Sequence, residues 1–101
     1  MDSTLINNLQ AYFQSQPVEK VWLFGSFSRG EERPDSDIDF IVEFSQDAKI
    51  GLQYFRIISD LEDISKRRVD LAEIDMIDAK IKRQVNNEKI LIYERSCQGQ
   101  S

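Results

Sequence analysis

Residues 24–40 read "FGSFSRGEERPDSDIDF", and the fold can be worked out from this stretch outward. The run VEKVWLF at 18–24, which leads into this stretch, is rich in β-branched and aromatic residues. It predicts a buried strand that stops at a sharp Gly-Ser turn. SFSRG then suits one helical turn, and EERPDS suits a loop. After the loop, DIDFIVEF at 37–44 alternates and predicts a second strand with Asp37 and Asp39 on one face.

Apolar residues at helical spacing predict three helices in the rest of the chain, at residues 3–15, 51–67 and 76–88. In the second helix we expect an inward stripe that recurs every three positions, with Ile57 at its edge. The members of that stripe are Leu52, Phe55, Ile58, Leu61 and Ile64. We expect the phenylalanines to be buried as well, except Phe27, which is expected to be exposed in the turn.

The remaining segments complete one small domain. Residues 68–74 predict a third strand, and residues 89–94 predict either a short closing strand or an extension of the last helix. We expect a single domain at residues 1–95 and a flexible tail at residues 96–101. The fold class is α/β (α+β), a small mixed β-sheet with helices packed against it.

The composition limits the chemistry that the chain can perform. It has 101 residues, a net charge of −5, no histidine and one cysteine, Cys97. Without histidine, carboxylates and hard, oxygen-binding metals are left as the means of catalysis. The acidic charge argues against a protein that coats nucleic acid. No apolar run is long enough to span a membrane and the N-terminus does not resemble a signal peptide, so we expect a cytoplasmic protein.

The Gly-Ser turn has the features of a phosphate-binding site. A strand that leads through a turn into a helical segment directs free backbone N–H groups at one point. Gly25 permits close approach, the hydroxyl of Ser26 adds a donor, and Arg29 lies on the same side of a helical turn. The pattern is neither a Walker A loop nor a dinucleotide fingerprint. Taken alone, it is also consistent with an ordinary strand end and a surface arginine.

Three aspartates supply the acidic side of the site. Asp37 and Asp39 project from one face of a strand, and their repulsion is relieved if a cation sits between them, as Mg²⁺ does between carboxylates and substrate phosphates. Asp70 interrupts the apolar run VDL and would suit a base that accepts the proton of an attacking hydroxyl. The alternatives are strand-start capping for the first two and pairing with Arg67 or Arg68 for Asp70.

Together these residues form the pattern G-S-x-x-R-G followed by S-D-x-D, which resembles the nucleotidyltransferases of the DNA polymerase β superfamily. The residues of the pattern are Gly25, Ser26, Arg29, Gly30, Ser36, Asp37 and Asp39. The likeness is nearest to the minimal nucleotidyltransferase (MNT) family and spans about residues 3–95. It implies the nucleotidyltransferase fold, with the glycine, serine and arginine positions binding the nucleotide. It also implies that Asp37, Asp39 and Asp70 are catalytic and hold two Mg²⁺ ions.

The resemblance further implies a reaction and a partner. MNT proteins often pair with a helical HEPN toxin, and characterised members transfer AMP from ATP to a tyrosine of that toxin. This implies an adenylyltransferase antitoxin that forms a hetero-oligomer with its partner. Two alternatives stay open: an antitoxin that neutralises its partner by binding alone, and nucleotidyl transfer to RNA or to a small molecule.

Overall fold

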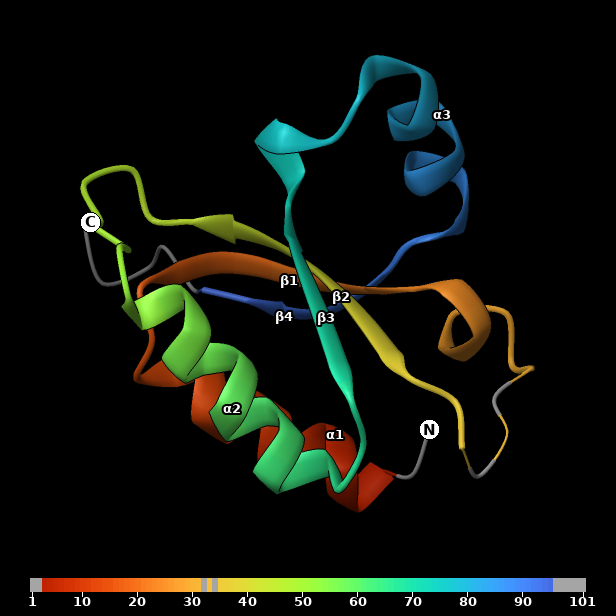
Figure 1. The fold of residues 1–101 in the computed structure, drawn as a ribbon, viewed down its shortest axis with the longest axis horizontal. Helices are drawn as coiled ribbons and strands as arrows, with labels where there is room; N and C mark the ends of the chain where they lie inside the picture. Colours follow the sequence, from red (N-terminus) through yellow and green to blue (C-terminus); the bar gives the residue numbers. More distant parts are fainter. Residues whose placement is uncertain (1–2, 32, 34, 96–101) are drawn as a thin grey trace.

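The computed structural model describes residues 3–31, 33 and 35–95 (Figure 1). The described residues form three α-helices, four strands and two short 3₁₀ turns, η1 and η2, and each turn follows a strand. The elements are α1 (Ser3–Gln14), β1 (Val18–Phe24), η1 (Gly25–Phe27), β2 (Ile38–Phe44), α2 (Gln53–Ser65), β3 (Val69–Glu73), η2 (Ile74–Met76), α3 (Ala79–Glu88) and β4 (Ile90–Glu94). The predicted tail at 96–101, including Cys97, lies outside the described residues.

The four strands form one mixed sheet in the order β3-β2-β1-β4. β1 runs antiparallel to both β2 and β4, and β2 runs parallel to β3. The segment that the sequence left open, residues 89–94, is therefore a strand that closes the sheet beside β1. The mixed sheet confirms the expected fold class.

The two faces of the sheet are covered differently. Figure 1 shows α1 and α2 side by side on one face, with α3 on the other side of the sheet. The main core lies under α1 and α2, and its largest fully buried side chains are Phe13, Phe40, Leu9, Ile38, Ile57 and Leu61. A smaller cluster on the opposite face joins Ile41, Ile74 and Val85. The face under α1 and α2 therefore carries the main core that stabilises the fold, and the face on the α3 side remains partly open.

The inward stripe of α2 differs from the predicted one. Ile57, expected at the edge, is completely buried with Leu61, whereas Leu52 is 84% exposed and Phe55 is 64% exposed. A strict three-residue repeat drifts by about 60° per step around a helix of 3.6 residues per turn, so its members cannot share one face. The buried positions follow a four-residue step instead, from Ile57 through Leu61 to Ser65.

Phe27 also departs from its expected exposure. Its side chain is 6% exposed and belongs to the main core, because the turn folds back onto the sheet.

No helix in the described part of the chain is both long and apolar enough to cross a membrane.

Candidate active site

Asp39 and Asp70 come together because two neighbouring strands run in parallel. In the register of β2 and β3, Asp39 lies directly opposite Asp70, and the carboxyl group of Asp70 is near enough to raise the pKa of Asp39. Asp70 is exposed, because it alternates along β3 with the buried Val69 and Leu71 and so points to the opposite face of the sheet. The sequence predicted that these acids would lie near one another, and the sheet places Asp39 and Asp70 opposite each other.

The environment of Asp39 favours its protonated form. Partial burial raises the pKa of Asp39, and the neighbouring carboxyl groups of Asp70 and Asp37 raise it further, while the positive charge of Arg29 acts in the opposite direction. Asp37, one residue before β2, lines an adjoining hollow together with Ser36 and Arg67. The three predicted acids are thus neighbours, with Asp39 and Asp70 as the close pair.

Gly25 allows the turn to press against the acid pair. Its φ is +76°, a left-handed conformation that favours glycine, and a Cβ atom there would lie closer than 3.0 Å to Oδ2 of Asp39. Its carbonyl oxygen accepts hydrogen bonds from the backbone N–H of Ser28 at 3.0 Å and from the Ser28 hydroxyl at 2.8 Å. Ser28, which the sequence analysis did not single out, therefore helps to fix the turn.

The rest of the predicted phosphate turn is compact. The backbone N–H of Glu31 donates to the carbonyl of Ser26 at 2.8 Å and closes the segment after η1. Gly30 has a φ of +70°, and a Cβ atom there would meet nothing within 4 Å. Gly30 is therefore required by the backbone conformation rather than by close packing.

Arg67 ties the loop before Asp37 to the turn, a role that the sequence did not reveal. Its Nη1 donates to the carbonyl oxygen of Arg33 at 2.7 Å and to that of Ser36 at 3.0 Å. Its guanidinium also lies 5.0 Å from the ring centroid of Phe27. The hydroxyl of Ser36 accepts from the backbone N–H of Arg33 at 2.7 Å, so within this loop Ser36 stabilises the turn that leads to Asp37. Spacing along the chain could not indicate these contacts, because they join segments about thirty residues apart.

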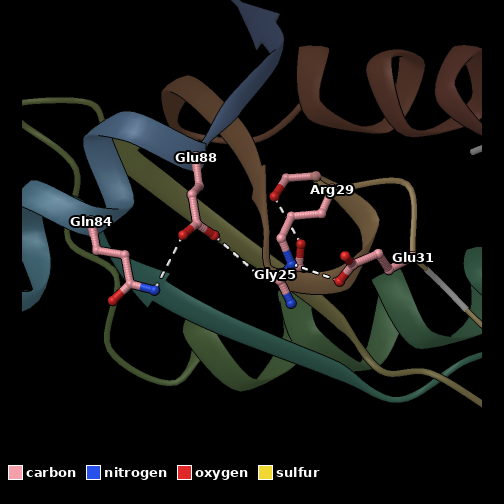
Figure 2. A network of polar contacts seen from close by, with 6 residues as sticks. Gly25, Arg29, Glu31, Gln84 and Glu88 are labelled. Atoms are coloured by element: carbon pink, nitrogen blue, oxygen red, sulfur yellow. Dashed lines mark hydrogen bonds and ion pairs between the residues drawn. The ribbon is translucent and has the colours of Figure 1, made fainter.

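Arg29 is held by two glutamates. Its Nε donates to Glu31 at 2.9 Å and its Nη1 donates to Glu88 at 3.0 Å, as Figure 2 shows. Glu31 comes from the turn itself, whereas Glu88 is the last residue of α3, fifty-nine positions away. Both bonds raise the pKa of Arg29, which stays charged. The sequence indicated Arg29 but gave no sign of Glu88.

A cleft of about 490 Å³ opens beside the acid pair. Asp39 and Asp70 are its acidic residues at the β2–β3 edge, and Asp78 stands where α3 begins. Its apolar lining includes Phe24, Ile41, Ile77, Ile81 and Val85. The cleft thus places an acidic pair next to an apolar wall on the open face of the sheet, which suits a ligand with a charged part and an apolar part.

The donor set fits a hard divalent cation. In the described ranges, no three acidic, cysteine or histidine side chains already converge as a group that could hold a metal ion. Mg²⁺, however, takes one or two carboxylates and completes its octahedron with water and substrate phosphates. The adjacent oxygens of Asp39 and Asp70 meet that need, and a cation between them would relieve the repulsion that raises the pKa of Asp39. A part for Asp37 in the same set stays a prediction.

Fold and site together define a nucleotidyltransferase, since a strand-ending glycine turn lies against paired acids on a mixed sheet. The family described as "Polymerase beta, Nucleotidyltransferase" matches residues 7–98, so the chain belongs to this family. It is 31% identical over 75 residues to the protein adenylyltransferase MntA of Thermococcus cleftensis, covering 74% of this chain and 75% of that protein.

Two solved complexes have the same fold. A toxin–antitoxin crystal structure with AMP-PNP matches with a TM-score of 0.76 at 20% identity, over 90% of this chain and 74% of that chain. The complex of the tri-AMPylated Shewanella oneidensis HEPN toxin with its MNT antitoxin matches with a TM-score of 0.71 at 18% identity, over 94% and 74%. At these identities the likeness concerns the fold.

Proposed function

We propose that this chain is an antitoxin that transfers AMP from ATP to a tyrosine hydroxyl of a partner HEPN toxin. The observation that carries the proposal is the pairing of Asp39 with Asp70 against the Gly25 turn, in a chain of the nucleotidyltransferase family. The adenylyltransferase MntA and the solved toxin–antitoxin complexes support the choice of nucleotide and partner. The active unit is then a hetero-oligomer in the cytoplasm.

The reaction is an in-line displacement at the α-phosphorus of ATP. The acceptor oxygen forms a bond to this phosphorus, the bond to the pyrophosphate oxygen breaks, and the hydroxyl proton passes to Asp70. Asp70 suits this task because it is exposed, lies opposite Asp39 in the sheet and lines the cleft.

The turn binds the phosphates in this proposal. The backbone around Gly25 and Ser26 and the Ser26 hydroxyl would supply donors, and the charged Arg29 adds a guanidinium. Gly30 contributes the left-handed backbone conformation that lets the turn close. Ser36 acts on the other side, by fixing the loop that carries Asp37. The apolar wall of the cleft then remains for the less polar parts of the two substrates.

Asp39 and Asp70, with Asp37 beside them, would hold Mg²⁺, two ions in the full proposal. Mg²⁺ bound there would neutralise charge on the attacking and leaving oxygens. Without it, Asp39 and Asp70 stand as like charges at neighbouring strand positions.

The test is the intact mass of a candidate HEPN partner, taken first from the neighbouring gene, after incubation with this chain, ATP and Mg²⁺. We expect the partner to gain one or more AMP units. Asp39→Asn and Asp70→Asn should each slow the gain by at least about a hundredfold, because each removes one oxygen anion of the pair. Asp47→Asn, an exposed aspartate outside the cleft, is the matched control and should leave the rate unchanged.

A stable complex whose partner gains no mass with ATP or any other nucleoside triphosphate would contradict the proposal. The chain would then be an antitoxin that acts by binding alone.

A further inference from the structure

Glu88 stands at a position that helix formation alone disfavours. It is the last residue of α3, where the helix dipole is negative and an acidic side chain costs stability. α3 also buries a single one of its ten residues, Val85, so packing does little to fix its end. An acidic side chain at this unfavourable position is expected to have a partner that compensates its cost. Residues that are unfavourable for local structure occur most often at functional sites.

The partner of Glu88 is Arg29. Figure 2 shows the Arg29 guanidinium between Glu31 and Glu88, with Gln84 on the far side of Glu88. Each carboxylate oxygen of Glu88 has a donor, since Oε1 accepts from Nη1 of Arg29 at 3.0 Å and Oε2 accepts from Nε2 of Gln84 at 3.2 Å. The Glu88 side chain is 27% exposed, against 63% for Glu31, so solvent screens the Glu88 bond less.

The two hydrogen bonds orient Arg29 and still leave some of its N–H donors free to bind a ligand. A guanidinium has five N–H donors. Within the described residues, the bonds to Glu31 and Glu88 occupy Nε and one hydrogen of Nη1, which leaves the Nη2 group and the second Nη1 hydrogen for a ligand. In this orientation the charge of Arg29 reaches the carboxyl group of Asp39. Glu88 therefore keeps the guanidinium beside the acid pair and does not withdraw it.

We propose that Glu88 is a positioning residue for ATP: by holding Arg29 across the end of α3, it fixes the guanidinium that binds the triphosphate. This inference rests on the proposed function, because it assigns a partner to one phosphate-binding residue of that site. An arginine whose guanidinium is already held in place loses less side-chain entropy on binding ATP than a freely rotating one. Loss of the Glu88 bond therefore weakens ATP binding, even though removing Glu88 also removes a nearby negative charge.

The experiment measures the equilibrium binding of ATP with Mg²⁺ to the isolated chain by titration calorimetry. We expect Glu88→Gln to weaken binding about fivefold, the size expected for one charge-assisted contact. Glu94→Gln is the matched control, because it removes the same charge from an exposed residue that pairs with Lys20 on the sheet edge. It should leave ATP affinity within about twofold.

A double variant separates positioning from a general effect. In an Arg29→Met background, adding Glu88→Gln should change affinity by less than about twofold, since Glu88 acts through Arg29. Tighter or unchanged ATP binding in Glu88→Gln, or an equal loss with and without Arg29, would overturn the inference.

The two proposals fail in different ways. A wild-type chain that neither binds ATP nor transfers AMP would overturn both the proposed function and the inference resting on it. A wild-type chain that binds ATP with no response to Glu88→Gln would overturn the inference alone.

Discussion

At the scale of single residues, Gly25 has two separate reasons to be glycine. Its positive φ is unfavourable for other residues, and a side chain there would meet the carboxylate of Asp39. Gly25→Ala should therefore lower the free energy of unfolding by about 2 kcal/mol or more, and it should reduce AMP transfer more than tenfold by displacing Asp39. Urea denaturation and the partner's intact mass measure the two effects.

Gly30→Ala is the control for the first effect. Its φ of +70° is nearly the same, and nothing lies within 4 Å of the added methyl group. It should cost about 1 kcal/mol, the strain alone. Equal losses of stability in the two variants would show that the contact with Asp39 contributes nothing.

Asp39 couples catalysis to stability. Its folded-state pKa is raised, chiefly by burial, so its protonated form stabilises the fold below the unfolded-state pKa, and this contribution is lost as pH rises through the folded-state pKa. Without divalent metal, Asp39→Asn should therefore be more stable than the wild type at pH 7 by up to about 1 kcal/mol, a modest figure because the site is partly solvated. The difference should vanish at about pH 3.

Unfolding free energies in urea with EDTA, measured from pH 3 to pH 8, check this expectation. Asp47→Asn should show no such trend, because Asp47 is exposed and outside the site. A wild type at least as stable as Asp39→Asn at pH 7 would mean that the carboxylate is not strained by its neighbours.

At the scale of elements, the sequence predicts what depends on neighbouring residues and misses what depends on distant ones. β1 occurs at the predicted bounds, 18–24, since its apolar run and Gly-Ser stop are local signals. The α2 stripe was wrong because several registers of one apolar helix fit the sequence, and packing against the sheet selects Ile57 and Leu61. The closing strand β4 could be settled only by its pairing with β1.

In the candidate site, too, residues with a local signal could be predicted and contacts between distant segments could not. Gly25, Asp39 and Asp70 could be predicted, because a turn and two strand acids leave a pattern in the chain. Their contact depends on the parallel register of β2 and β3, which the pattern does not specify. Arg67 and Glu88 could not be predicted, since each acts across the fold on a residue far away in sequence.

At the scale of the whole molecule, the two faces of the sheet differ in how firmly they are held. α1 and α2 bury Leu9, Phe13, Ile57 and Leu61 in the main core, whereas α3 buries Val85 and is otherwise tied down by polar contacts at its end. Regions with little buried apolar surface open more often than the core. The cleft therefore lies between a rigid sheet and a helix that can move.

This difference predicts an uneven pattern of amide hydrogen exchange. Backbone amides of α3 should exchange at least about tenfold faster than those of α2 in the free chain. ATP with Mg²⁺ should slow exchange in η1 with the residues that follow it and in the C-terminal half of α3 together, because the bond between Arg29 and Glu88 joins these two segments. α1, on the opposite face, serves as the internal reference and should not respond. Protection of η1 without α3 would show that the two are not coupled, and equal exchange in α2 and α3 would show that the open face is as stable as the core.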